Sequence, residues 1–157
     1  MTNKDINYEL GLNSIWTDSL NNNQEPDDKA LINHLRTVHQ HNAGFTEKCA
    51  SICRDKVGRN SYEWLAEIVP DIDGMRVLDL ACGSGPLLKI LYDRKKKLRL
   101  KGVDMCPEEL ALAKARMSDG AVDLFQLEAQ NLTAINNDSI DVVLCHWALT
   151  LMDPITP

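Results

Sequence analysis

The sequence predicts an α/β fold, in which buried strands alternate with helices along most of the chain. From Met75 onward, short apolar runs alternate with segments of helical periodicity. A turn that contains Gly83 and Gly85 joins the first apolar run to the first of these helices. Because strands joined by helical crossovers pair in parallel with right-handed connections, we expect a mainly parallel sheet flanked by helices.

The same patterns predict where the elements of this part lie. Helices are expected over residues 86–93 and from Cys106-Pro107 onward, where proline in the first turn and the acids Glu108 and Glu109 suit the positive end of a helix. The apolar runs predict strands over residues 76–80, 98–103, 122–127 and 140–145.

The first 70 residues have a different texture, so we divide the chain into three parts. Residues 1–26 are polar and rich in asparagine, which predicts a loosely ordered arm. Residues 27–70 form a predicted helical segment, and residues 71–157 form the α/β core. No internal repeats accompany this division.

Three helices are expected in the helical segment. Asp27 and Asp28 suit the start of the first helix. The second helix is predicted over residues 46–56, before Gly58. Asn60 with Glu63 three residues later forms a capping box for the third.

Composition and charge restrict the function. The chain has 157 residues, enough for one domain with a core, and its net charge of −6 argues against a general nucleic-acid binder. No apolar run approaches the roughly 20 residues that span a bilayer, and the N-terminus lacks the apolar core of a signal peptide. Five cysteines without framework spacing indicate reduced thiols, so we expect a cytoplasmic protein.

The segment Val77-Leu78-Asp79-Leu80-Ala81-Cys82-Gly83-Ser84-Gly85 indicates the chemistry. It reads as a buried strand, a tight turn and a helix start, the arrangement that binds a nucleoside-bearing cofactor. A dinucleotide fingerprint needs a third glycine three residues after the second, where this chain has Leu88. The glycine spacing therefore disfavours an NAD enzyme.

This segment resembles motif I of the class I S-adenosylmethionine-dependent methyltransferases, which have a Rossmann-like fold. Asp79, Ala81, Gly83 and Gly85 follow the family pattern, with alanine in place of its first glycine. The resemblance implies that this loop, Cys82 included, lies against the methionyl part of S-adenosylmethionine, with Asp79 near its amino group. It also implies that the N-terminal helices form part of a lid.

Two further pairs of residues continue the resemblance. Asp104 ends the second strand, where the family places an acid on the ribose hydroxyls, and Met105 would flank the adenine ring. Glu128 and Ala129 end the third strand, where relatives contact the adenine through an acid and a backbone amide. Glutamate stands here in place of the commoner aspartate.

The fourth strand ends at Cys145 or His146, which the resemblance places near the reactive sulfonium. His146 is interpreted as a cofactor contact or a structural histidine, and base catalysis is not predicted for it. We predict no catalytic residue. Trp147 is expected to pack against its neighbours.

Other residues with metal-binding or catalytic side chains are given structural roles. Cys49 and Cys53 are four residues apart on a helix, but they have no further partners, so core packing is expected and no metal site. His34, His39 and His41 are expected on the surface.

The resemblance implies an enzyme that transfers a methyl group from S-adenosylmethionine to an unidentified acceptor and leaves S-adenosylhomocysteine. The chain ends after the fourth strand, which exposes one edge of the predicted sheet. Either the chain is a truncated part of a longer enzyme, which we favour, or an oligomer or partner covers the edge. Two alternatives stay open. One is a non-catalytic binding or scaffold protein with the same fold, and the other is an enzyme like the aminopropyltransferases.

Overall fold

The computed structural model describes residues 17, 19, 21–24, 28–94, 97–118 and 120–152. Most of the predicted arm over residues 1–26 lies outside the described residues. The helices and strands are α3 (Asp28–His41), α4 (Phe45–Ile52), α5 (Ser61–Glu67), β1 (Arg76–Leu80), α6 (Pro86–Tyr92), β2 (Arg99–Asp104), α7 (Pro107–Ala115), β3 (Val122–Gln126), β4 (Val142–Cys145) and the 3-10 helix η1 (Leu149–Leu151).

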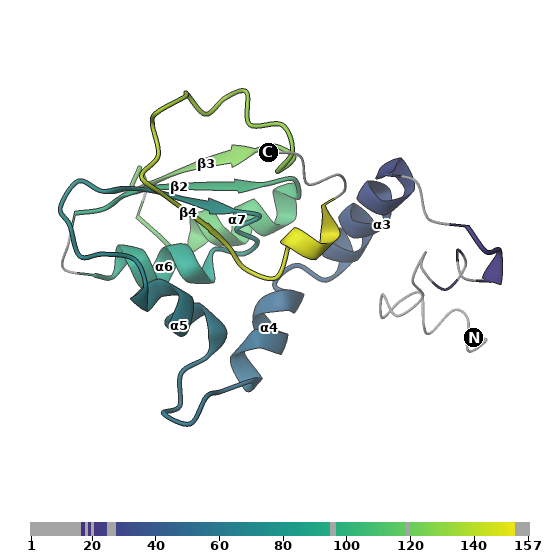
Figure 1. Ribbon diagram of the computed structural model, residues 1–157, viewed down its shortest axis with the longest axis horizontal. Helices are drawn as coiled ribbons and strands as arrows, with labels where there is room; N and C mark the ends of the chain where they lie inside the picture. Colours follow the sequence, from purple (N-terminus) through teal and green to yellow (C-terminus); the bar gives the residue numbers. More distant parts are fainter. Residues whose placement is uncertain are drawn as a thin grey trace.

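The sheet contains four parallel strands in the order β3-β2-β1-β4. The chain moves outward from β1 through β2 to β3 and then returns to add β4 on the other side. In the central register, Asp79 of β1 lies between Gly102 of β2 and Leu144 of β4. Figure 1 shows the strands pointing toward α3 and the yellow 3-10 helix, so their carboxyl ends meet the N-terminal helices. The predicted α/β fold with a parallel sheet is confirmed.

Gly85, the residue before α6, lies close to α7. Gly85 has a left-handed backbone with φ of 77°. Residues that have a Cβ atom rarely adopt this conformation. A Cβ atom at Gly85 would lie 2.9 Å from the Cβ atom of Ala113 on α7. Leu87, Leu88 and Leu91 of α6 are fully buried against the sheet. This core fixes the loop between β1 and α6.

The N-terminal helices pack against the core from two directions. Contacts join α3 to α7 and α5 to α6, and α4 lies between them in the chain and contacts α5. The capping box of α5 is confirmed, because Asn60 accepts a hydrogen bond from the Glu63 N–H and Glu63 accepts one from the Asn60 N–H. The division of the chain into arm, helical segment and core stays a prediction.

The prediction for α4 was wrong at its C-terminal end. The helix ends at Ile52, four residues before the predicted limit, and Cys53 already has an extended backbone. Asp55 forms the next turn instead, with its carboxylate accepting the N–H groups of Val57 and Arg59. Such side-chain bonds to nearby backbone compete with helix formation. Cys53 is therefore exposed rather than packed in the core, whereas Cys49 is half-buried.

Within the described residues, no helix is long and apolar enough to cross a membrane.

Candidate functional site

A pocket lies at the carboxyl ends of the strands, beneath the N-terminal helices. It contains about 1030 Å³ of unoccupied space, part of which opens to solvent. The loop after β1 and the ends of the other three strands form its floor, and α3, α4 and the start of α5 contribute residues from above. Ligand sites in open parallel sheets form at this edge, where the loops after the strands come together.

Most of the residues that the sequence selected for a cofactor line this pocket. They are Asp79, Ala81, Cys82, Gly83, Asp104, Met105, Glu128, Ala129 and His146. Gly85 and Cys145 are not among the lining residues. Gly85 instead allows the close contact with Ala113, and Cys145 is half-buried and pairs with Leu80 in the sheet. What each lining residue binds stays a prediction.

The loop after β1 has an unusual backbone at its first position. Ala81 is left-handed with φ of 57°, a conformation that costs an alanine roughly 1 kcal/mol. The next residues are fixed by the neighbouring strand, since the Cys82 N–H donates to the Val103 carbonyl and the Gly83 N–H to Asp104. The loop is thus held in shape before any ligand binds.

Asp79 is a buried acid beneath this loop. Asp79 is the penultimate residue of β1, just before the loop, and is 2% exposed. Burial and the neighbouring Asp104 raise the pKa of Asp79 to about 8. The carboxyl group is therefore largely protonated at neutral pH in this structure, and a cationic ligand group would favour its ionised form.

Asp104 links the loop to the end of β2. Its Oδ2 atom accepts the Gly83 N–H at 2.8 Å, and its Oδ1 atom accepts the Cys106 N–H at 2.9 Å. Burial raises the pKa of Asp104, and these two backbone bonds oppose that rise. Each carboxylate oxygen retains a further lone pair for a ligand hydroxyl.

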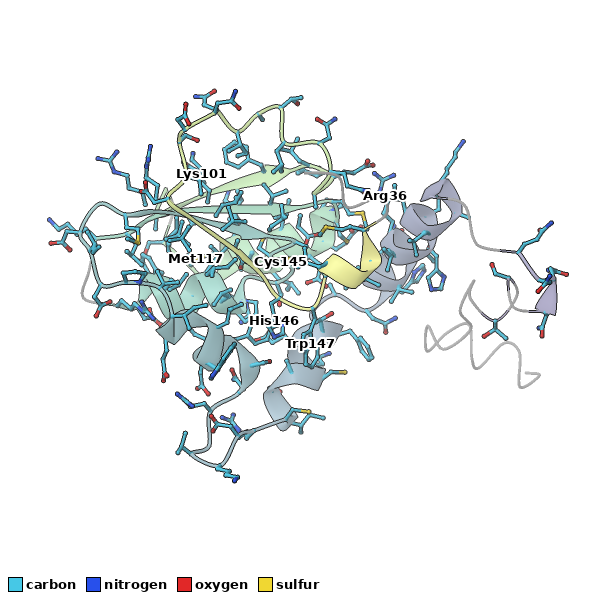
Figure 2. The ribbon with its side chains drawn as sticks, in the orientation of Figure 1. Arg36, Lys101, Met117, Cys145, His146 and Trp147 are labelled. Carbon is cyan, nitrogen blue, oxygen red and sulfur yellow. The ribbon has the colours of Figure 1, made fainter. Side chains whose placement is uncertain are left out.

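Glu128, after β3, already has a partner on the N-terminal helices. Its Oε1 atom lies 2.7 Å from Nη2 of Arg36 on α3, and both side chains are partly exposed. Figure 2 shows Arg36 on the side of α3 next to the sheet. A ligand amine that bonds Glu128 would share this carboxylate with the guanidinium or displace it.

His146 lies between two aromatic rings at the end of β4. Its ring stacks on Tyr62 at a centroid distance of 3.9 Å and on Trp147 at 4.9 Å. Its Nε2 atom is 2.7 Å from the hydroxyl of Ser61, while the buried Nδ1 atom has no hydrogen-bond partner among the described residues. Burial lowers the pKa of His146, so the ring is neutral at pH 7. Figure 2 shows His146 and Trp147 following Cys145, next to the N-terminal helices.

Trp147, for which packing was expected, stacks on His146 but is largely exposed. The side chain is 52% exposed, and the residue has a left-handed backbone with φ of 57°. A bulky residue in this region is unusual and indicates strain held by its surroundings. Trp147 lines the pocket with its neighbour His146.

Sequence reasoning missed a buried pair that joins α3 to α7. Glu109 is 2% exposed, and its Oε1 atom lies 2.9 Å from Nδ1 of His39. His39 is therefore not a surface histidine, as had been predicted, and the bond to Glu109 raises its pKa. The acids at the start of α7 were predicted only from their position at the helix end, which does not distinguish Glu109 from Glu108.

A second missed contact joins α4 to the glycine loop. Glu47 accepts a hydrogen bond from the Ser84 hydroxyl at 2.8 Å and from Arg116 at the end of α7. The pocket is acidic as a whole, because Glu47, Asp79, Asp104, Glu109 and Glu128 line it together with two histidines. Among the described residues, no group of three or more His, Cys, Asp or Glu side chains has an arrangement that could hold a metal ion.

Comparisons with known proteins agree with this arrangement. An 85-residue stretch is 28% identical to the ubiquinone biosynthesis O-methyltransferase of Leptothrix cholodnii, and covers 52% of this chain and 35% of that protein. The fold is also similar to that of a protein described as a methyltransferase, which was solved in complex with the Trm112 methyltransferase activator of Haloferax volcanii. The TM-score is 0.56 and the identity 23%, and the similarity covers 70% of this chain and 46% of that one. A protein from Listeria monocytogenes, described as an S-adenosylmethionine-dependent methyltransferase, is 27% identical over 54% of this chain and 38% of its own, with a TM-score of 0.47.

The chain thus spans about a third of the curated relative and less than half of the first of these structures. The family model described as "Methyltransferase domain" matches residues 77–156, just over half of the chain. That segment contains the glycine loop and the three strand ends at which Asp79, Asp104 and Glu128 meet. The chain therefore belongs to the methyltransferase domain family, with the Rossmann-like fold of the class I S-adenosylmethionine-dependent enzymes.

Proposed function

We propose that this chain binds S-adenosylmethionine in the pocket and transfers its methyl group to an acceptor. One observation supports the proposal most strongly. Three adjacent parallel strands, β1, β2 and β3, bring Asp79, Asp104 and Glu128 to one pocket beside a preformed glycine loop. The cofactor has a cationic amino group, a ribose diol and an exocyclic amine, and each of these donates hydrogen bonds that a carboxylate accepts.

In the proposed complex each acid has one role. Asp79 receives the amino group of the methionyl part, Asp104 the ribose hydroxyls, and Glu128 the adenine amine. Met105 and Ala129 border the adenine, and the backbone of the glycine loop borders the methionyl chain. S-adenosylmethionine supplies an activated methyl group, and the chain positions it for displacement by the acceptor.

The acceptor atom enters from the side of His146 and Trp147. His146 is neutral, and its Nε2 atom is bonded to Ser61, so we assign it to shaping the site rather than to removing a proton. The rings of Tyr62, His146 and Trp147 line this wall of the pocket, where His146 stacks on the other two. Product S-adenosylhomocysteine would occupy the same nucleoside site.

The proposal predicts that removing the Asp104 carboxylate weakens cofactor binding. We expect Asp104→Ala to weaken the affinity for S-adenosylmethionine at least about tenfold, since hydrogen bonds to charged groups contribute roughly 1.5–3 kcal/mol. Calorimetric titration with S-adenosylmethionine, S-adenosylhomocysteine and NAD measures this, and NAD should not bind the parent chain.

The matched control is Asp123→Ala on the neighbouring strand β3. Asp123 bonds Lys101 on the sheet surface and does not line the pocket. Its removal should leave the affinity unchanged. If Asp104→Ala bound S-adenosylmethionine as tightly as the parent, the ribose assignment would be wrong.

We also propose a reducing, cytoplasmic location and a polypeptide partner for the sheet edge. All five cysteines are free thiols, and burial raises the pKa of Cys106 to about 11, which keeps that thiol protonated. β4 forms one edge of the sheet, with Val143 and Leu149 exposed nearby. Such an edge offers backbone groups for pairing with another strand.

A further inference from the structure

We infer that Glu109 is a positioning residue of the cofactor site, which acts by holding the turn between α3 and α4 against the glycine loop. The inference rests on the proposed function, because it concerns the roof of the same pocket. Two donors bond the Glu109 carboxylate, and neither of them belongs to its own helix. Its Oε1 atom accepts from His39 Nδ1 at 2.9 Å and from the Gly44 N–H at 3.0 Å, and its Oε2 atom accepts from the same N–H at 3.1 Å.

Gly44 explains why this hold fixes the direction of the chain. It is buried, lies before α4 and has a left-handed backbone with φ of 77°. A Cβ atom at Gly44 would be 3.7 Å from Leu112 and 4.0 Å from the Ser84 hydroxyl of the glycine loop. The turn therefore lies directly on the loop, and bonding its N–H to Glu109 sets where α3 ends and α4 begins.

Glu109 is also adjacent to the loop itself. A Cβ atom at Gly83 would lie 3.8 Å from its Oε2 atom. The Glu109 carboxylate thus lies between the turn before α4 and the glycine loop. The pocket is lined by this residue together with His39, Gly44 and Gly83. A ligand in the pocket would meet this arrangement already assembled.

A positive charge on His39 strengthens its hydrogen bond to Glu109 and so helps to keep the turn between α3 and α4 in place. Hydrogen bonding to Glu109 raises the pKa of His39, burial opposes that rise, and nearby Asp104 adds to it. His39 is therefore protonated below its ordinary pKa and loses this proton as the pH rises through the raised value, which weakens its bond to Glu109. The other titratable groups around the turn are Glu47, which pairs with Arg116, Glu128, which pairs with Arg36, and the buried Asp79.

Hydrogen exchange without cofactor tests the hold directly. In the parent chain we expect protection of the backbone amides of residues 39–48, corrected for the intrinsic rate, to fall between about pH 6 and about pH 9. His39→Gln should remove that pH dependence. Glu109→Gln should lower protection at every pH, because the amide forms weaker hydrogen bonds than the carboxylate.

Cofactor binding then tests the positioning role. We expect Glu109→Gln to weaken S-adenosylmethionine binding about tenfold or more, and His39→Gln by a smaller factor, with no change in circular dichroism. The matched control is Glu108→Gln, the same change on the same helix one residue earlier. Glu108 does not line the pocket and contacts the Cys106 thiol, so this variant should behave as the parent does.

The outcomes separate the two proposals. If the parent chain binds no S-adenosylmethionine, the proposed function fails, while the exchange experiment still decides whether Glu109 holds the turn. If Glu109→Gln binds as the parent does, the positioning role is wrong. If it loses affinity while the turn keeps its protection, Glu109 contacts the ligand directly and the inference is also wrong. His39→Gln retains the Gly44 bond and decides the question if Glu109→Gln does not fold.

Discussion

At the scale of single residues, the buried Asp79 lowers the stability of the fold as the pH rises, although its carboxylate is the proposed partner of the ligand's amino group. Its pKa rises to about 8 because burial disfavours the charge. The unfolded chain releases this proton near the ordinary value of 3.8, whereas the folded chain keeps it. Between these values the folded state binds more protons, so the contribution of Asp79 to the free energy of unfolding falls as the pH rises and is lost above about pH 8.

We expect Asp79→Asn to stabilise the fold, and more strongly at about pH 8.5 than at about pH 6, by at least about 2 °C in Tm at the higher pH. The same change should lower the affinity for S-adenosylmethionine about tenfold or more, since it removes the carboxylate for the amino group. Thermal unfolding and calorimetry at both pH values measure the two effects. Asp93→Asn, an exposed change next to Lys89, serves as the control.

The pH dependence of binding in the parent chain follows from the same group. A cationic ligand favours the ionised form of Asp79. The affinity for S-adenosylmethionine should therefore increase from about pH 6 toward pH 8, and its binding should release a proton from Asp79. A variant lacking Asp79 should not show this release. Equal stability of parent and Asp79→Asn at both pH values would contradict the buried charge.

Residue by residue, the sequence predicted the floor of the pocket better than its roof. Asp79, Asp104 and Glu128 each end an apolar run, so their pattern placed them at one sheet edge. Glu109 and His39 follow no such pattern. Each meets its partner only because α3 packs on α7, about 70 residues away in the chain.

At the scale of elements, Gly85 allows the start of α6 to lie close to Ala113 on α7. Gly85→Ala would place a Cβ atom 2.9 Å from Ala113 Cβ and 3.2 Å from its Cα in a left-handed backbone. We expect a loss of about 2–4 kcal/mol in the free energy of unfolding, measured by denaturant titration, from backbone strain and crowding together.

Gly74→Ala isolates the backbone strain. Gly74 has a similar φ of 81°, but a Cβ atom there would have no neighbour within 4 Å. Its cost should stay near 1 kcal/mol. Similar losses for both variants would show that the contact with Ala113 is unimportant.

Element prediction succeeded at the start of α5 and failed at the end of α4, and side-chain bonds to nearby backbone decide both positions. The capping box at Asn60 set the start of α5 as predicted. The end of α4 was wrong because the Asp55 side chain provides backbone bonds that compete with the helix, and helical periodicity alone does not report such bonds.

At the scale of the whole molecule, one edge of the sheet is β4. We expect self-association at high concentration through this edge, and Val143→Lys should suppress it, because charged side chains discourage edge pairing. Light scattering over a concentration series measures the mass. Val143 is 56% exposed, and Val57→Lys, at an exposed position in the turn after α4, is the control.

A parent chain that stays monomeric at all concentrations would contradict self-association at β4. Parallel pairing of the strands was expected from the alternation of strands and helices, whereas their order β3-β2-β1-β4 was not predicted. How the N-terminal helices dock was not predicted either, since the contacts that fix them, such as Arg36 with Glu128 and Ser84 with Glu47, join distant parts of the chain.

The pocket residues on α3 and α4 affect where this protein can be truncated and over which residues it should be aligned with its relatives. The homologous segment begins at residue 77, but Leu35, His39, Gly44 and Glu47 all precede it. A recombinant fragment trimmed to the homologous boundaries would retain every recognisable motif and lack one wall of the binding site. An alignment restricted to that segment would likewise compare the motifs and omit these four pocket residues.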